Sequence, residues 1–147
     1  MDVVGTLRIS SSLAGTIVRH FAAALPNEGC GLLSGRPEGA ALVAEQFFPG
    51  TNQLASPSRF AMEPAEVMTA LTAIDLNGSR LIAIVHSHPV TGAVPSRTDP
   101  RDAFYPQALL LIVSFGEPEP RMRAWRVRGA GEPSGVEEVA IRVVSGT

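Results

Sequence analysis

The segment from Arg80 to Pro89 constrains the fold most, because a continuous apolar run there ends in two histidines. Residues Leu81 to Val85 are all apolar, which is typical of a strand that is covered on both faces. Pro89 has no backbone N–H to donate to a sheet, so we expect the chain to leave the sheet there. A strand covered on both faces needs a layer on each side, which predicts a layered α/β domain.

The rest of the chain supplies helices and strands to build these layers. Apolar residues at helical spacing between three serines and Pro26 predict a first helix, and a second begins near Pro64 and closes at Asn77-Gly78. A third, short helix is expected near Asp99-Pro100. Strands are expected at 3–9, 29–34, 40–47, 80–88, 108–114, 121–128 and 136–144. We therefore expect one α/β (mixed α+β) domain over residues 1–147, with a central mixed β-sheet flanked by two or three helices.

Composition narrows the function. The 147 residues are 45% apolar, which suits one compact domain, and 12 basic against 14 acidic residues give a net charge of −2. No basic face is indicated, so we expect no nucleic-acid partner. All the basic residues are arginine, which excludes Schiff-base chemistry on lysine. The single cysteine, Cys30, excludes an intramolecular disulfide, a cysteine zinc cage and the Pro-Cys-x-x-Cys site of zinc deaminases.

No targeting signal is expected. The first residues lack a basic region followed by an apolar run, so we expect no signal peptide. No stretch approaches 18 uncharged apolar residues, so we expect no membrane partner. These expectations together favour a cytoplasmic protein.

The two histidines at the end of the apolar strand are the candidate metal ligands. His86 and His88 are two residues apart, so on a strand both imidazoles point to the same face and can reach one ion. The loop after them contains Gly92 and Pro95, and it can fold back to deliver Asp99 as a third ligand. Two histidines and one carboxylate leave the fourth position of a tetrahedral zinc open, as a catalytic site requires.

A metal hydrolase also needs a group that moves the proton of the attacking water. Glu28 is our choice, because it lies between the end of the first helix and the strand that begins at Gly29. Ser96 would suit stabilisation of the oxyanion, because its hydroxyl is a neutral donor near the metal.

Each choice has a structural alternative. Ser96 and Asp99 have the spacing of a capping box, and Thr98 or Asp99 could instead cap a helix that starts at Pro100. Asp102 competes with Asp99 as a ligand. Glu28 follows Pro-Asn, where an exposed turn carboxylate is the default.

Three other polar features have structural explanations as well. Cys30 is most simply a small buried residue, and His20 a packing or surface residue of the first helix. Arg121, Arg123, Arg126 and Arg128 form a basic cluster, which a charged strand near a sheet edge explains as well as a binding patch does.

Together these residues resemble the JAMM metalloproteases, also called MPN+ domains. The pattern of that family is a distant Glu followed by His-x-His-x7-Ser-x2-Asp, and here Glu28, His86, His88, Ser96 and Asp99 match every element. The resemblance implies a JAB1/MPN-like fold, layered as in cytidine deaminases, and a zinc-dependent peptidase or isopeptidase. It implies that Glu28 is the acid/base, that His86, His88 and Asp99 bind zinc, and that Ser96 supports the oxyanion.

Within this family the chain looks most like the compact bacterial branch related to the Mec+ peptidase of cysteine biosynthesis. The segment from Asn52 to Pro64 and the Tyr105-Pro106 pair contribute to this similarity. It implies a partner with a C-terminal Gly-Gly tail, namely a ubiquitin-like or sulfur-carrier protein. The loop Val90 to Pro95 is also similar to that of the RadC branch. The alternative function is a non-catalytic MPN-type scaffold that binds metal without turnover, and a homodimer is compatible with either.

Overall fold

The computed structural model describes residues 5–95, 107–127 and 135–146. The elements in these ranges are β1 (Thr6–Ser10), α1 (Ser11–Ala24), β2 (Cys30–Glu38), β3 (Ala41–Gly50), α2 (Pro64–Leu76), β4 (Arg80–His88), β5 (Leu109–Ser114), β6 (Arg121–Val127) and β7 (Val136–Val144). The expected strands and the two longer helices are confirmed, with β2 and β3 extending beyond their predicted ends. The short helix expected near Asp99-Pro100 lies outside the described residues.

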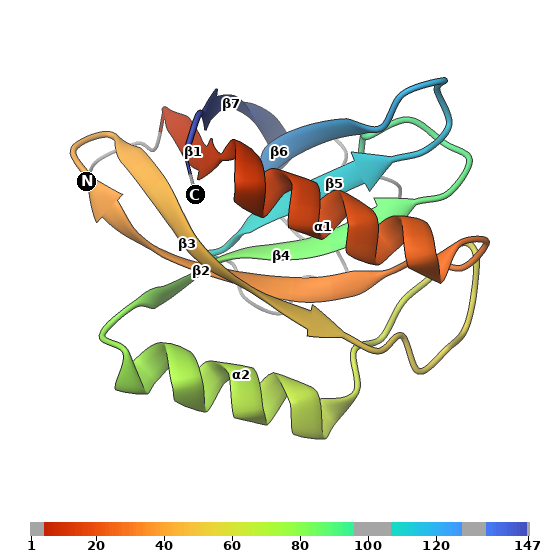
Figure 1. The fold of residues 1–147 in the computed structure, drawn as a ribbon, viewed down its shortest axis with the longest axis horizontal. Helices are drawn as coiled ribbons and strands as arrows, with labels where there is room; N and C mark the ends of the chain where they lie inside the picture. Colours follow the sequence, from red (N-terminus) through yellow and green to blue (C-terminus); the bar gives the residue numbers. More distant parts are fainter. Residues whose placement is uncertain (1–4, 96–106, 128–134, 147) are drawn as a thin grey trace.

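The strands form one mixed sheet that closes on itself (Figure 1). Their order around the closed sheet is β1-β3-β2-β4-β5-β6-β7, and β1 is parallel to both β3 and β7. The expectation of a mixed sheet is confirmed. The expectation that this sheet is a central layer flanked by helices is corrected, because β1 pairs with β7, with Thr6 level with Ala140, and closes the sheet into a barrel. This pairing leaves no unpaired edge among the described strands. Backbone N–H and C=O groups that would be exposed at the edges of an open sheet are therefore hydrogen-bonded.

The two helices pack on opposite faces of the sheet (Figure 1). Helix α1 begins where the Ser10 hydroxyl accepts a hydrogen bond from the Leu13 backbone N–H, and it buries Ile17 and Phe21 one turn apart. Helix α2 begins at Pro64, whose missing N–H suits the first turn. Gly78 follows it with a φ of +68°, a left-handed conformation that glycine adopts without strain.

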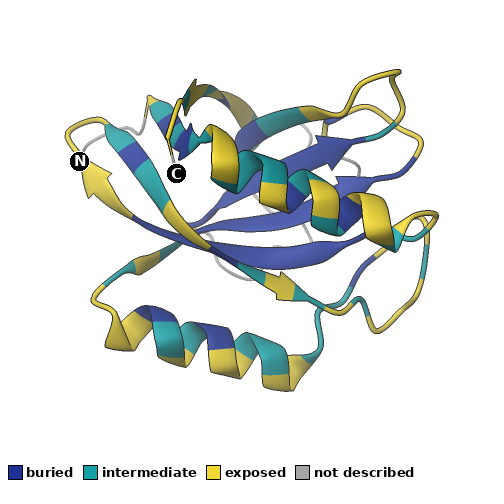
Figure 2. Ribbon diagram, viewed as in Figure 1, coloured by how far each residue is buried: buried dark blue, intermediate teal, exposed yellow. Residues whose placement is uncertain are grey.

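The alternation of β4 divides the core into two parts. Ala83 and Val85 face the cluster that contains Ile17 and Phe21 of α1, whereas Ile84 faces the cluster that contains Ala70 of α2. Figure 2 shows that the middle strands are buried along most of their length while the helices expose their outer faces. The prediction that β4 is covered on both faces is therefore confirmed.

Glycines beside Cys30 let aromatic rings approach the start of β2. A Cβ built on Gly29 would lie 2.3 Å from Cδ1 of Phe21, and one built on Gly31 would lie 2.5 Å from Cε1 of Phe47. Both distances are too short for real side chains, so only glycine allows these rings to pack against the strand. In the sequence Glu-Gly-Cys-Gly, the two glycines therefore present no side chain to the face of the sheet that α1 covers. The side chains of Glu28 and Cys30 alternate with them.

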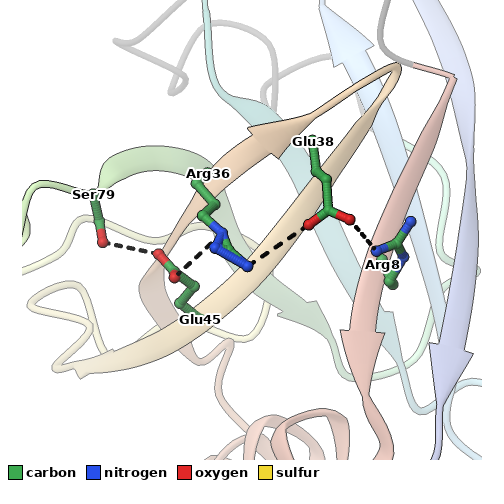
Figure 3. Close-up of polar contacts among 5 residues, drawn as sticks. All are labelled: Arg8, Arg36, Glu38, Glu45 and Ser79. Atoms are coloured by element: carbon green, nitrogen blue, oxygen red, sulfur yellow. Dashed lines mark hydrogen bonds and ion pairs between the residues drawn. The ribbon is translucent and has the colours of Figure 1, made fainter.

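At the opposite end of β2 and β3, a chain of polar contacts crosses three strands (Figure 3). The Arg8 guanidinium lies 3.3 Å from Glu38, and Arg36 lies 3.7 Å from Glu38 and 3.8 Å from Glu45. The Ser79 hydroxyl donates to Glu45 over 2.9 Å. These side chains are partly exposed, so each ion pair contributes at most about 1 kcal/mol.

Neither α1 nor α2 has the length and apolar character that crossing a lipid bilayer would require.

Candidate metal centre

The pairing of β2 with β4 brings Glu28 beside the two histidines. Cys30 lies level with His86, and the Ser87 N–H donates to the Gly29 carbonyl over 3.1 Å, which continues the register toward Glu28 and His88. Residues directly opposite each other in an antiparallel pair share one face of the sheet, so Glu28, His86 and His88 do. All three are buried, with exposed fractions of 3%, 0% and 3%.

Ser87, on the other face, fixes this register. Its hydroxyl accepts a hydrogen bond from the Gly29 N–H over 2.8 Å while its own N–H donates to the Gly29 carbonyl. Both groups of Gly29 are therefore bonded to one residue of β4. The residue before Gly29 is held at the level of the histidines as a result.

The geometry of the two imidazoles fits a shared metal ion. Nε2 of His86 lies 3.2 Å from Nε2 of His88. Two nitrogens at adjacent corners of a zinc tetrahedron, with Zn–N distances of about 2.0–2.1 Å, lie about 3.3 Å apart. The separation of the two nitrogens therefore matches the one that a shared zinc ion would impose.

A backbone carbonyl selects the tautomer of His88 that a metal needs. Nδ1 of His88 lies 2.7 Å from the Gly92 carbonyl oxygen, which can only accept, so this nitrogen carries the proton. The lone pair is then on Nε2, the atom that faces His86. A carbonyl that orients a ligating imidazole in this way is common around protein metal sites.

Three consecutive backbone carbonyls of the loop after β4 accept hydrogen bonds from side chains of the sheet. The Ser114 hydroxyl donates to the Thr91 carbonyl, His88 to that of Gly92, and the Trp125 indole N–H to that of Ala93 over 2.9 Å. Loop residues 91–93 are thus fixed to β4, β5 and β6. This loop leads directly to Ser96 and Asp99.

Glu28 is not the exposed turn carboxylate that its sequence context predicts. Its N–H donates to the Ser56 carbonyl over 2.8 Å, and its carbonyl accepts from the Asn52 side chain over 3.0 Å. The loop that follows β3 therefore folds over the start of β2 and buries the residue.

Asn52 organises that loop. Its amide nitrogen donates to the carbonyls of Glu28 and Arg59, and its oxygen accepts from the N–H groups of Leu54 and Ala61. The loop in turn places Phe60, whose ring stacks on His86 with centroids 4.7 Å apart and an interplanar angle of 20°. One wall of the histidine pair is therefore aromatic.

Sequence reasoning did not single out Asn52, Phe60, Ser87, Ser114 or Trp125 as parts of the site. Only Ser114 has a local signal, a hydroxyl at the end of the buried apolar strand β5. The others act through partners far away in the sequence.

Ser96 and Asp99 lie outside the described residues, as does the competing ligand Asp102. Their roles, and their alternative explanation as helix caps, stay predictions. Within residues 5–95, 107–127 and 135–146, no three His, Cys, Asp or Glu side chains form a group that could hold a metal ion.

Cys30 is a buried residue, as expected, with 1% of its surface exposed. Burial raises the pKa of its thiol to about 12, and the negative charges of Glu66 and Glu28 act in the same direction. The thiol is therefore protonated at neutral pH and is a poor nucleophile.

The basic cluster is not on a sheet edge, because β6 pairs with both β5 and β7. Arg123 forms two hydrogen bonds with the Glu138 carboxylate, at 2.8 and 2.6 Å, and Arg126 contacts Glu137 on β7. The edge explanation is therefore wrong, and cross-strand ion pairs account for these two arginines. Arg128 lies outside the described residues.

His20 is a packing residue, as expected. Its ring lies 5.6 Å from the Phe47 ring and 5.5 Å from the Phe21 ring, centroid to centroid. It lies on α1, which packs on the face of the sheet away from the two strand histidines.

Comparison with known proteins shows the family to which the chain belongs. Residues 10–128 match the family model described as prokaryotic homologs of the JAB domain. The CysO-cysteine peptidase of Mycobacterium tuberculosis is 34% identical over 125 residues, which cover 84% of each chain. The desampylase of Haloferax volcanii is 35% identical over 100 residues, covering 67% of this chain and 68% of that protein.

A solution structure of a protein from Desulfitobacterium hafniense shares the fold. It superposes with a TM-score of 0.83 at 35% sequence identity, and the match covers 95% of this chain and 94% of that one. The family match spans most of the chain, from the start of α1 to the end of β6, and includes both histidines and Glu28. The chain therefore belongs to the prokaryotic JAB-domain family.

Proposed function

We propose that the protein is a zinc-dependent peptidase or isopeptidase that hydrolyses the amide bond at the C-terminal Gly-Gly tail of a ubiquitin-like or sulfur-carrier protein. One observation carries this proposal. Gly29, the residue after Glu28, is hydrogen-bonded through both its N–H and its carbonyl to Ser87, the residue between His86 and His88, whose Nε2 atoms lie 3.2 Å apart. A proton acceptor beside two convergent metal donors is the arrangement that metal-assisted hydrolysis needs.

In this proposal His86, His88 and Asp99 would hold the ion. Asp99 is assigned as a ligand from its spacing in the sequence motif. When bound there, zinc would supply polarisation of the scissile carbonyl and a water acidic enough to attack near neutral pH. Ser96 donates a hydrogen bond to the carbonyl oxygen as it gains negative charge. The hydrogen bonds to residues 91–93 support the functions proposed for Ser96 and Asp99, because they fix the chain that precedes these two residues.

Glu28 moves the proton. It accepts a proton from the attacking water and passes it to the departing amine, which leaves as the neutral amine. Its fixed backbone favours this function, since a base that serves two steps must stay within reach of both the water and the leaving nitrogen.

The relatives support the class of substrate. Their names describe a CysO-cysteine peptidase, a desampylase and, for a Thermus thermophilus protein, a probable TtuB-protein conjugate cleaving protease. An extended glycine-rich tail suits a narrow buried site, because it exposes its backbone without side chains in the way. A cytoplasmic location, a homodimer and a single domain over residues 1–147 stay predictions from the sequence.

The decisive experiment separates the metal from the base. A sulfur-carrier protein extended beyond its Gly-Gly tail is incubated with wild type, Glu28→Gln, and Glu117→Gln as an exposed control, and bound zinc is measured in each. We expect Glu28→Gln to retain zinc and lose about 100-fold or more in kcat, the usual loss for a general acid/base. Stoichiometric zinc without cleavage of any tail-bearing carrier would instead favour the scaffold.

A second pair of variants tests the third ligand. Asp99→Asn is expected to lose bound zinc, whereas Asp102→Asn is expected to keep it, because only Asp99 has the family spacing from His88. Zinc loss from Asp102→Asn alone would assign the ligand to Asp102. Full zinc content in both variants would assign these carboxylates to helix capping.

A further inference from the structure

A pocket of about 400 Å³ lies beside His86, between the sheet, α2 and the loop that follows β3. Its volume is within the range of small-molecule sites, about 300–1,000 Å³. Cys30, Leu32 and Ile84 of the sheet line one side, and Val67 of α2 lines another. The loop contributes Leu54, Arg59, Phe60 and Met62.

The pocket shares two walls with the histidine pair. Phe60 lines the pocket and stacks on the His86 ring at 4.7 Å, and Cys30 lines it and lies level with His86. Directly opposite residues have Cβ atoms about 4.5–5.5 Å apart. The pocket therefore begins within one side-chain length of the expected metal ligand.

The lining is apolar except for one cation. Arg59 is exposed and lines the pocket, and its backbone carbonyl accepts a hydrogen bond from the Asn52 side chain. Among the described residues, no carboxylate forms an ion pair with its guanidinium. A guanidinium at the rim of an apolar pocket suits a ligand with an apolar body and a carboxylate.

We propose that this pocket is the leaving-group subsite: it takes the side chain of the single residue released on hydrolysis, and Arg59 binds that residue's α-carboxylate. The proposal rests on the proposed function. The acyl side of the bond ends in two glycines, which have no side chains to fill such a pocket. Of the residues next to the scissile bond, the one on the amine side is therefore the one whose side chain could fill the apolar volume.

The reaction then has a defined leaving group. Water adds across the amide, the carbonyl carbon gains the hydroxyl oxygen, and the nitrogen gains a proton as the C–N bond breaks. The product is a free amino acid that already carries its carboxylate. A lysine side chain in an isopeptide bond lacks a carboxylate at that distance, so such conjugates are poorer substrates.

The carboxylate test uses carriers that end in Gly-Gly-Leu with either a free acid or a carboxamide terminus. We expect wild type to prefer the acid by about threefold to tenfold in kcat/KM, since Arg59 is exposed and screened. Arg59→Gln should abolish the preference, and Arg59→Lys should keep part of it. Arg80→Gln, at the opposite end of β4, should behave as wild type. Equal rates on acid and amide in wild type would overturn the proposal and leave the proposed function intact.

The side-chain test varies the last residue among Leu, Met, Ala and Asp. Leucine and methionine should exceed alanine by about tenfold or more, and aspartate should be slowest, because the lining is apolar. Leu54→Ser should narrow the difference between leucine and alanine, and Leu54 is 48% exposed, so the fold tolerates the change. No dependence on the side chain would overturn the apolar part of the proposal.

A binding test does not require zinc or turnover. Leucine and leucinamide are titrated into the metal-free protein, and NMR signals of Leu54, Ala61 and Met62 are followed. Leucine should shift these signals at lower concentration than leucinamide, and Arg59→Gln should remove the difference. Absence of any shift from either probe would overturn the subsite, even if no carrier were cleaved.

Discussion

Asn52 joins the base to the aromatic wall of the site through one side chain. Its amide nitrogen donates to the carbonyl of Glu28, just before β2, and to the carbonyl of Arg59, beside Phe60. Its oxygen holds the loop by accepting two further N–H groups. An amide is the side-chain group that can donate two hydrogen bonds and accept two at once.

We predict that Asn52→Asp weakens both stability and catalysis. The carboxylate keeps the two accepted bonds but cannot donate to Glu28 and Arg59, and it places a charge against two carbonyls. The expected loss is about 1–3 kcal/mol in the free energy of unfolding, measured by urea denaturation, with kcat falling more than KM rises. Gln53→Glu makes the same chemical change on the exposed neighbour and should be close to wild type. A stable Asn52→Asp protein with full kcat would contradict this view of Asn52.

At this scale the histidines were predictable and the burial of Glu28 was not. Two histidines two residues apart on an apolar strand must share a face, whatever surrounds them. The burial of Glu28 depends on Ser87, Ser56 and Asn52, which lie 24 or more residues away in the chain. No local pattern around Pro-Asn-Glu-Gly encodes those partners.

At the scale of elements, the loop after β4 is ordered by the strands beside it. Ser114 ends β5 and lies level with His88, and its buried hydroxyl donates to the Thr91 carbonyl while accepting from the Gly116 N–H. Gly116 allows this close approach, because a Cβ there would lie 2.5 Å from the Val90 carbonyl oxygen. The end of β5 therefore sets the path of the loop.

Ser114→Ala is expected to loosen this loop. It leaves two partly buried backbone groups, the Thr91 carbonyl and the Gly116 N–H, without their partner, which costs about 1–3 kcal/mol. Amide hydrogen exchange in residues 90–95 should accelerate. Ser79→Ala removes an exposed hydroxyl from the distal network of Figure 3 and should cost no more than about 0.5 kcal/mol. Equal effects of the two variants would show that Ser114 has no special function in the loop.

The helices were predictable because their signals are local. Ser10, Pro64 and Asn77-Gly78 mark their ends through contacts within one turn. The strand with the arginine cluster was assigned to an edge because charge alone cannot report which strands lie beside it. Its neighbour β7 supplies the carboxylates that explain the charge.

At the scale of the whole molecule, β1 and β7 turn an open sheet into a barrel. The pairing joins residues 6–10 to residues 140–144, nearly the full length of the chain apart. Alternation within each strand predicts that it belongs to a sheet but not which distant strand it will join. The closure of the sheet into a barrel could therefore not be predicted from the sequence.

Leu7→Ala should show how much the closing strand contributes. Leu7 is completely buried in the core cluster shared with α1, so its truncation is expected to cost about 2.7–5 kcal/mol through lost burial and a cavity. Leu76→Ala makes the same change on a side chain that is 80% exposed and should cost well under 1 kcal/mol, the usual range of surface substitutions being about 0.5 kcal/mol. Chemical denaturation measures both, and similar midpoints would contradict the packing described for β1.

The ion pair between β6 and β7 predicts a small acid sensitivity. Hydrogen bonding to Arg123 lowers the pKa of Glu138 from 4.5, so the pair stabilises the fold above that pH and the contribution is lost as the pH falls through the lowered value. Glu138→Gln should remove that part of the pH dependence, by less than about 1 kcal/mol because both side chains are partly exposed. Urea midpoints at pH 7 and pH 3 measure it, with Glu119→Gln as the control for loss of a charge. An unchanged difference between the two pH values would contradict the prediction.

The parallel pairing of β1 with β7 also has a consequence for biosynthesis. During translation β1 is synthesised early and β7 after every other described strand. One edge of β1 and one edge of β6 therefore stay unpaired until residues 136–144 have been synthesised. Such edges invite pairing with other chains, and contacts this distant in sequence form slowly. Translation that stops before β7 thus yields a polypeptide that carries both histidines and Glu28 but an open sheet, which makes it a substrate for aggregation or for quality-control proteases.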